Sequence, residues 1–289
     1  MTDLARRNFL LAGAAAPLAA RAMAAGLAEP EEAAAPERFE AVGGYRLKAA
    51  IESNPLALLP CGSLEYHGPH NPFGTDSIII GGIAERVAAR TGALLFPVVN
   101  FTHCPTHTAR FQGTLSIRPE VMTLYYEEIL RVILGAGFGR IFMLNGHDGN
   151  VGPARGAISK VASEDPEAAI LFASWWEALP REEMVKLNLF HQSNGGHGHG
   201  GPLETAAVQA FRPEWVHLEK AHDLPAPPDL STEMPYYLEK ASAEEWPGYS
   251  GKVSEASPDK GNKIVRISED RIVKLIENWM KDPAAPGSW

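Results

Sequence analysis

The chain has 289 residues, of which 45% are hydrophobic and 21% charged, and its formal net charge at pH 7 is −9. This length and composition are typical of a globular protein that buries a core in one large domain or two small ones. The net negative charge and the absence of a Lys/Arg cluster exclude nucleic acid as the expected partner.

Residues 1–36 are expected to lie outside the folded domain. The pair Arg6–Arg7 precedes a short apolar run over 9–20, and the small residues at 22–24 resemble a cleavage site. The run is about half of the roughly 20 residues that a membrane-spanning helix requires. The pattern therefore indicates a twin-arginine export signal followed by an acidic linker, with a frayed amphipathic helix as the alternative. We predict a periplasmic or exported protein that has no membrane contact after signal removal, and whose folded domain covers 37–289.

The rest of the chain alternates apolar runs typical of buried strands with helical patterns. Strands are expected over 56–62, 93–99, 140–146 and 168–174, and helices over 77–92, 118–138, 150–165, 202–211 and 264–281. Strands separated by helices predict a mainly parallel sheet covered on both faces, which is a three-layer α/β/α single domain. Between residue 222 and the last helix, Pro, Gly and aromatic residues predict long ordered loops that form a lid or a subunit contact.

The stretch GSLEYHGPHNPFGTD, residues 62–76, concentrates candidate metal ligands directly after the first expected strand. In an extended segment, Glu65 and His67 project the same way because residues i and i+2 share a face. The glycines and prolines that follow can turn the chain back and bring Asp76 beside them. Two carboxylates and an imidazole suit Zn²⁺ or Mn²⁺. Taken singly, Asp76 is also a candidate helix N-cap, and His67 a loop histidine bonded to the backbone.

Polar residues also follow the other expected strands. His103 comes after the second strand and His147 after the third, whereas His199 and Glu204 follow the fourth at a distance. Ligands of open parallel sheets bind outside the carboxyl ends of the strands. We therefore expect these four side chains to lie on the same rim as the 62–76 stretch.

Four runs of the sequence, in this order, resemble signatures of the creatininase family of creatinine amidohydrolase-like metal hydrolases. They are GSLEYHGPHNPFGTD (62–76), ARFQGTLSI (109–117), NGHDGN (145–150) and GHGHGGPLETA (196–206). The resemblance covers roughly residues 50–210. It implies a creatininase-like α/β fold with parallel strands at its centre, a dinuclear metal site and a homo-oligomer, often a hexamer.

The resemblance implies a metal ligand at each of five positions. Glu65, Asp76 and His147 would bind one divalent ion, whereas His67, Asp76 and Glu204 would bind the other, so that Asp76 bridges the pair. Zn²⁺ is the first expectation for both ions, with Mn²⁺ or Fe²⁺ as alternatives because carboxylate-rich sites accept all three.

The resemblance also implies how a substrate would react. His199 stands at the position of the family's catalytic histidine and would donate a proton to the leaving nitrogen. Asp148 would assist by orienting ligands, a role that Asn145 shares. A hydroxide held between the metals would attack the carbonyl of a small-molecule amide, for example a cyclic, creatinine-like one. The expected enzyme is an amidohydrolase that acts on C–N bonds other than peptide bonds.

Three departures from the family pattern argue against creatinine itself. Gly149 and Gly198 stand where the creatinine-hydrolysing members have glutamates, and Pro202 replaces the first glutamate of the last signature. Two other functions therefore stay open. One is an exported metal-binding protein of the same fold without turnover, and the other is a dinuclear phosphoesterase.

Several other residues leave two interpretations open. Cys61 and Cys104 are expected to be small buried side chains, with a disulfide as the alternative. His103 and His107 either line the pocket or belong to a hydrogen-bonded loop. Trp175 and Trp176 either wall the pocket or pack in the core.

Overall fold

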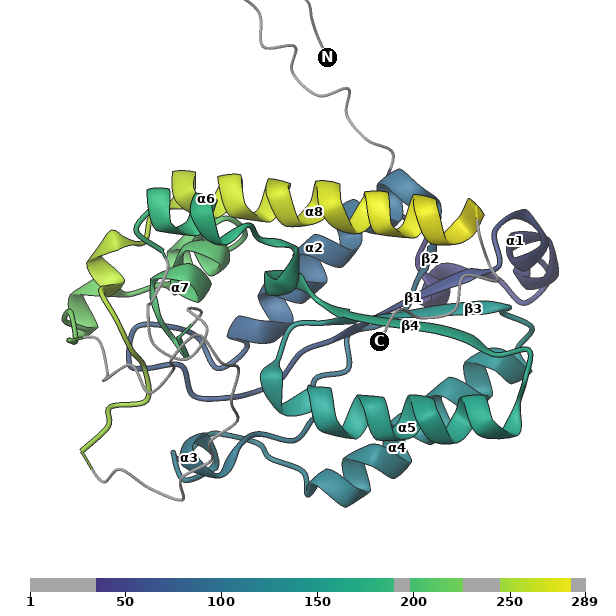
Figure 1. Ribbon diagram of the computed structural model, residues 1–289, viewed down its shortest axis with the longest axis horizontal. Coiled ribbons are helices and arrows are strands. Elements are labelled where there is room, and N and C mark those ends of the chain that lie inside the picture. Colours follow the sequence, from purple (N-terminus) through teal and green to yellow (C-terminus); the bar gives the residue numbers. More distant parts are fainter. Residues whose placement is uncertain (1–34, 190–197, 226–244, 282–289) are drawn as a thin grey trace, which may run out of the picture. The chain divides into compact units, whose positions relative to one another are not determined.

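The computed structural model describes residues 35–189, 198–225 and 245–281 (Figure 1). Its centre is a sheet of four parallel strands in the order β2-β1-β3-β4. The strands are β1 (Leu56–Cys61), β2 (Leu94–Leu95), β3 (Arg140–Asn145) and β4 (Ala169–Ser174). The predicted parallel sheet is therefore confirmed.

Helices cover both faces of this sheet. They are α1 (Leu47–Ser53), α2 (Thr75–Thr91), α3 (Thr106–Ala109), α4 (Pro119–Gly135), α5 (Val151–Glu164), α6 (Arg181–Lys186), α7 (Pro202–Gln209) and α8 (Pro258–Lys281). Helices α2, α7 and α8 lie on one side of the sheet, and α4 and α5 lie on the other (Figure 1). The predicted three-layer α/β/α architecture is confirmed, and the short helices α1, α3 and α6 are additions to it.

Strand β2 is much shorter than the expected strand over 93–99. Pro97 has no backbone N–H and so cannot continue the hydrogen-bonded ladder. The chain returns to the sheet at Val99, whose N–H donates to the Pro60 carbonyl at 2.9 Å and whose carbonyl accepts the Gly62 N–H at 2.9 Å. The polar segment after Val99 consequently starts beside the end of β1.

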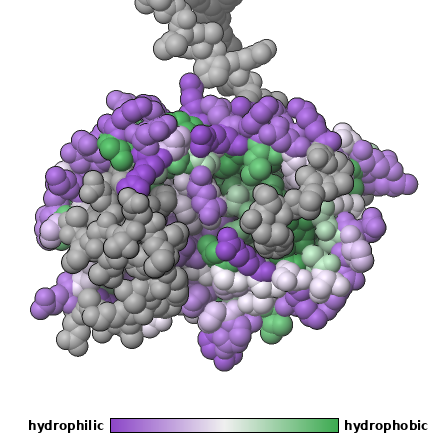
Figure 2. Space-filling model, viewed as in Figure 1, coloured by the Kyte–Doolittle hydropathy of each residue, from purple (hydrophilic) through white to green (hydrophobic). Residues whose placement is uncertain are grey.

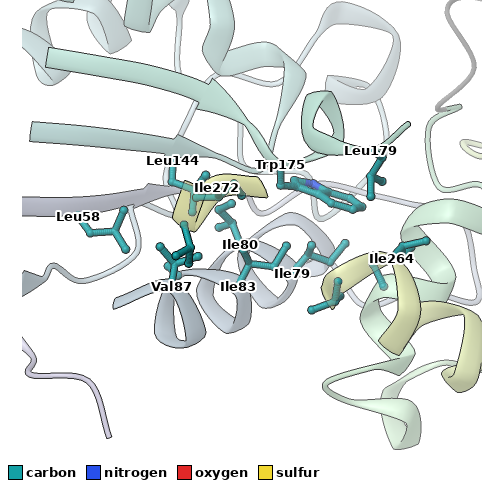
Figure 3. Packing of buried hydrophobic residues seen from close by; sticks show 14 of the residues in the cluster. Leu58, Ile79, Ile80, Ile83, Val87, Leu144, Trp175, Leu179, Ile264 and Ile272 are labelled. Carbon is teal, nitrogen blue, oxygen red and sulfur yellow. The ribbon is translucent and has the colours of Figure 1, made fainter. Parts of the chain in front are cut away.

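Side chains alternate between the two faces of the central strands. On β1, Leu56 and Leu58 pack towards α2 and α8, whereas Ala57 and Leu59 pack towards α4 and α5. Trp175, directly after β4, is 1% exposed and belongs to the first of these cores (Figure 3). Its role is therefore that of a core aromatic, which settles the open alternative for this residue.

Figure 2 shows hydrophilic residues around the rim of the described surface on the face drawn, and a hydrophobic area towards its middle. Among the described residues, no helix combines the length and the apolar character that crossing a membrane requires. The export signal and linker predicted over 1–36 fall almost entirely outside the described residues, as does 226–244 of the predicted loops, so both stay predictions.

Candidate metal centre

Six polar side chains meet at the carboxyl edge of the sheet. They come from the loop after β1, the first turn of α2, the end of β3 and the start of α7. They are Glu65, His67, Asp76, His147, His199 and Glu204. Four of them are less than 5% exposed, whereas the side chains of Glu204 and His199 are 16% and 20% exposed. Within the described structure, these two side chains are therefore the part of the cluster most accessible to solvent.

Asp76 lies between two histidines and presents one oxygen to each. Its Oδ2 is 2.9 Å from Nδ1 of His147, and its Oδ1 is 3.2 Å from Nε2 of His67. Glu65 Oε2 is 3.3 Å from the same His147 nitrogen, and Glu204 Oε2 is 3.8 Å from the same His67 nitrogen. The structure thus brings together both predicted ligand sets, with Asp76 common to the two.

The hydrogen bonds of the two histidines fix which nitrogen faces the carboxylates. Nε2 of His147 lies 2.8 Å from the His103 carbonyl, and Nδ1 of His67 lies 3.0 Å from the Glu65 carbonyl. A carbonyl only accepts hydrogen bonds, so each of these nitrogens carries the proton. In the neutral ring, the opposite nitrogen then presents a lone pair to the cluster, as a metal-binding imidazole requires.

Each carboxylate has its own hydrogen-bond donor. The hydroxyl of Ser63 donates to Asp76 Oδ2 at 2.6 Å, and the hydroxyl of Thr108 donates to Glu65 Oε1. The backbone N–H of Gly200 donates to Glu204 Oε2 at 2.6 Å. These donors hold the carboxylate oxygens in place before any ligand arrives.

The electrostatics of the cluster favour bound positive charge. Burial disfavours a charged His67, but the carboxylates of Asp76, Glu204 and Glu65 outweigh burial and raise the pKa of His67 to about 10. Burial raises the pKa of Glu204 to about 7, with His67 opposing the rise. The pKa of His147 is raised as well, so protons on His67 and His147 balance the ionised carboxylates of Asp76 and Glu65 when no cation is present. Divalent ions would supply the same neutralisation, so the donor set fits them.

His199 is placed differently from the other two histidines. Its ring stacks on His67 at a centroid distance of 4.2 Å, and its Nε2–H donates to the Tyr66 carbonyl at 2.7 Å. Burial and the nearby His67 charge lower the pKa of His199 to about 4. The ring is therefore neutral near pH 7, with its Nδ1 lone pair 3.8 Å from Glu65 Oε2. It must accept a proton before it can donate one.

A glycine sets the position of His147. A Cβ at Gly146 would lie 2.7 Å from Cβ of Ile80 and 2.9 Å from the Asp76 carbonyl, so only glycine lets the end of β3 lie this close to α2. The side-chain oxygen of Asn145 accepts the His147 N–H at 3.1 Å. The predicted orienting role of Asn145 thus has a contact that supports it.

Asp148 opens a short 3-10 turn, Asp148–Asn150, and is exposed. The catalytic role predicted for it stays a prediction.

His103 belongs to a hydrogen-bonded loop, since its Nδ1 lies 3.0 Å from the Ile117 carbonyl. His70 is buried, with Nε2 3.1 Å from Oγ1 of Thr205.

Sequence reasoning missed Cys104 as part of this site. Its sulfur, a Glu65 oxygen and a His147 nitrogen all lie within 4.8 Å of one another, and Cys104 is 1% exposed. Both cysteines are buried free thiols, so the expectation of small buried side chains is confirmed and the disulfide alternative is wrong. The only signal in the sequence is that Cys104 follows His103 in a loop on the same rim.

Sequence reasoning also missed an aromatic wall beside His199. The ring of Trp246 lies 5.7 Å from His199, 5.4 Å from His107 and 6.0 Å from Phe111. Phe111 in turn stacks on Tyr66 at 4.5 Å. The wall joins the segment before α8 to the loop around α3.

Comparison with known proteins gives a consistent picture. The family model "Creatininase: Creatinine amidohydrolase" matches residues 45–276. A mycofactocin precursor peptide peptidase of Mycobacterium ulcerans (strain Agy99) is 29% identical over 239 residues, which are 79% of this chain and 87% of that protein. A creatinine amidohydrolase of Pseudomonas putida is 26% identical over 236 residues, which are 76% of this chain and 88% of that protein.

Solved structures of creatininase share the fold. A crystal structure of creatinine amidohydrolase has a TM-score of 0.73 and 23% identity, and the match covers 84% of this chain and 97% of that chain. A structure described as "Creatininase Mn" has a TM-score of 0.72 and 22% identity, with coverages of 84% and 98%. The expected creatininase-like architecture is confirmed.

Proposed function

The chain belongs to the creatininase family of hydrolases. We therefore propose that it is a metal-dependent amidohydrolase that cleaves a C–N bond at a two-metal centre. Membership of the family confirms the expected enzyme class, a hydrolase. The observation that best supports a two-metal centre is the position of Asp76, whose two carboxylate oxygens each face a different histidine.

The residues present fit two ions. Glu65, Asp76 and His147 would hold one, and His67, Asp76 and Glu204 the other. Oxygen and imidazole donors of this kind accept Zn²⁺, Mn²⁺ or Fe²⁺. When bound, such ions supply Lewis acidity and lower the pKa of water.

His199 would move the proton that the leaving group needs. Its neutral Nδ1 accepts a proton on the open side of the cluster and then delivers it to the departing nitrogen. The hydrogen bond from Nε2 to the Tyr66 carbonyl holds the ring in this tautomer and stabilises the protonated ring. Trp246 and His107 lie beside this ring and would exclude water from the leaving group.

Gly149 supports a substrate other than creatinine. A Cβ at this position would lie 2.2 Å from the His103 carbonyl oxygen and 2.5 Å from His147 Nε2, so no side chain fits there. Glu204 is the carboxylate that takes the corresponding ligand role in our proposal. The names of the two relatives point to an amide bond in a peptide and to creatinine, so we propose a small amide and include short peptides among the candidates.

Metal analysis of the purified mature protein tests the centre. We expect close to two ions per chain in the wild type and a sharp fall in Asp76→Ala. Asp259→Ala is the matched control, because Asp259 also lies in the first turn of a helix but is exposed and remote from the cluster in the sequence. Near-zero metal in the wild type after Zn²⁺ or Mn²⁺ is supplied would overturn the proposal.

A substrate panel separates the alternative functions. Hydrolysis of cyclic amides or short peptides supports the amidohydrolase. Turnover of a generic phosphodiester alone would indicate the phosphoesterase instead. Stoichiometric metal without any turnover would indicate the exported metal-binding protein.

We also propose a homo-oligomer. Helix α4 exposes Val121, Leu124, Tyr125 and Val132, and the last of these is 64% exposed. Exposed apolar side chains on one helix are typical of subunit contacts. Light scattering after size-exclusion chromatography measures the assembly, and a hexamer is the expected result.

A further inference from the structure

We propose that the sulfur of Cys104 is a direct ligand of the ion held by Glu65 and His147. This inference rests on the proposed metal centre. It adds a soft donor to one of the two metal positions and leaves the other with oxygen and nitrogen donors alone.

The backbone around Cys104 is fixed in place. The Cys104 N–H donates to Oγ of Ser116 at 2.9 Å, and the same hydroxyl donates to the Cys104 carbonyl at 3.0 Å. Two residues before Cys104, the Thr102 hydroxyl donates to the Gly62 carbonyl at 3.0 Å. The thiol is therefore presented by a segment that is tied to the end of β1.

This segment also holds the neighbouring ligand. The His103 carbonyl accepts the Nε2–H of His147, which turns Nδ1 of that ring towards Glu65. Gly149 provides the space for this contact, because a Cβ there would meet the His103 carbonyl at 2.2 Å. The same backbone thus orients the imidazole and delivers the sulfur.

The sulfur, a carboxylate oxygen and an imidazole nitrogen converge on one buried point. All three donor atoms lie within 4.8 Å of one another, and each of the three residues is less than 5% exposed. The other thiol is unlike this one, since Cys61 Sγ lies 3.7 Å from the Leu59 carbonyl on β1. Within the part of the chain that the structure describes, Cys104 belongs to a group of possible metal ligands and Cys61 does not.

Binding would replace the thiol proton with the ion. The S–H bond breaks, the sulfur–metal bond forms with the sulfur's electron pair, and the proton leaves to solvent without any redox change. A thiolate selects soft or borderline ions, so Zn²⁺, Co²⁺ and Cd²⁺ are favoured over Mn²⁺ at this position.

Cobalt substitution of the full chain provides a readout that is independent of activity. We expect a sulfur-to-cobalt charge-transfer band in the near-ultraviolet spectrum of the Co²⁺ protein. The band should disappear in Cys104→Ala and Cys104→Ser and persist in the matched control Cys61→Ala. Zn²⁺ affinity should fall by about 10–100-fold in Cys104→Ser, the range seen even for residues that support metal ligands, whereas Mn²⁺ affinity should change little.

Two results would overturn the assignment. One is a wild-type Co²⁺ protein without the band although two ions are bound, and the other is a band that survives in Cys104→Ala. Circular dichroism melts of the metal-free variants check that they fold. A charge-transfer band without amide hydrolysis would contradict the proposed function and support Cys104 as a ligand. Amide hydrolysis without the band would support the proposed function and contradict Cys104 as a ligand.

Discussion

At the scale of single residues, Ser63 orients the carboxylate of Asp76, which the two proposed ions would share. Its hydroxyl donates to Asp76 Oδ2 at 2.6 Å in a fully buried site. We expect Ser63→Ala to lower metal affinity by about 10–100-fold because the carboxylate loses the contact that orients it. Competition with a coloured chelator measures the affinity.

Ser77→Ala serves as the control for this experiment. Ser77 donates to the Ser63 carbonyl at 2.7 Å and does not contact the carboxylate. Equal metal affinities of the two variants would show that the Ser63 hydroxyl has no orienting role.

A substitution of His199 distinguishes a role in proton transfer from a role in metal binding. His199→Gln should retain both ions, since all the proposed ligands are intact, and should lower kcat by about 10²–10⁴-fold because the proton carrier is gone. Metal content and steady-state kinetics on the same preparation check this. Loss of metal together with activity would instead make His199 a ligand.

The sequence predicted much of the site from local spacing. The i, i+2 relation of Glu65 and His67 follows from an extended chain. Asp76 is not a helix N-cap, because Gly74 occupies that position and the Asp76 carboxylate faces the histidines. Cys104 could not be found in this way, because it lies near His147 only after folding brings the segments that follow β2 and β3 together.

At the scale of elements, the contact between β3 and α2 sets the distance between His147 and Asp76. Gly146→Ala would place a methyl group against Ile80 and the Asp76 carbonyl. We expect it to destabilise the fold by about 1–3 kcal/mol and to weaken metal binding, because the two elements must move apart. Urea denaturation and chelator competition measure the two effects.

Gly152→Ala is the opposite case on the neighbouring helix α5. A Cβ there meets nothing within 4 Å, so alanine should raise stability by about 0.5–1 kcal/mol through its better helix propensity. Similar losses of stability in both variants would contradict the role assigned to the β3–α2 contact.

The elements themselves were largely predictable because apolar runs and helical periodicity are strong signals. The shortness of β2 was not foreseen, although Pro97 within the run gives its physical cause. The aromatic wall was not foreseen either, since Trp246 reaches His199 only through the tertiary fold.

At the scale of the whole molecule, stability should depend on pH when the metals are removed. The pKa of His67 is raised to about 10 from an ordinary value of 6.5, so its contribution is complete below about pH 6.5 and is lost as pH rises through 10. Glu204, whose pKa is raised from 4.5 to about 7, acts in the same direction at lower pH, because its contribution is complete below about pH 4.5 and is lost as pH rises through 7. The Tm of chelator-treated protein should therefore fall between pH 6.5 and 10.

Metal-loaded protein is the control for this pH series. Bound ions neutralise the carboxylates without protons, so its Tm should change much less over the same range. Parallel curves for loaded and chelated protein would count against the cluster as the source of the pH dependence.

Export is a further property of the whole chain that stays a prediction. Replacement of Arg6 and Arg7 by lysines should keep the protein in the cytoplasm, because the twin-arginine route requires the arginine pair. Cell fractionation measures the distribution. An unchanged periplasmic fraction would contradict the predicted signal.

The spread of the proposed ligands along the chain has a consequence for unfolding. They lie after β1, in α2, after β3 and in α7, so the metals would join segments from residue 65 to residue 204. With both cysteines reduced, the ions would be the cross-links of this protein, the task that disulfides perform in many exported ones. Because an unfolded chain cannot hold them, a free-ion concentration of 1,000 times Kd adds about 4 kcal/mol per site to stability. Metal release and unfolding would then be one event, and resistance to proteolysis would report metal occupancy.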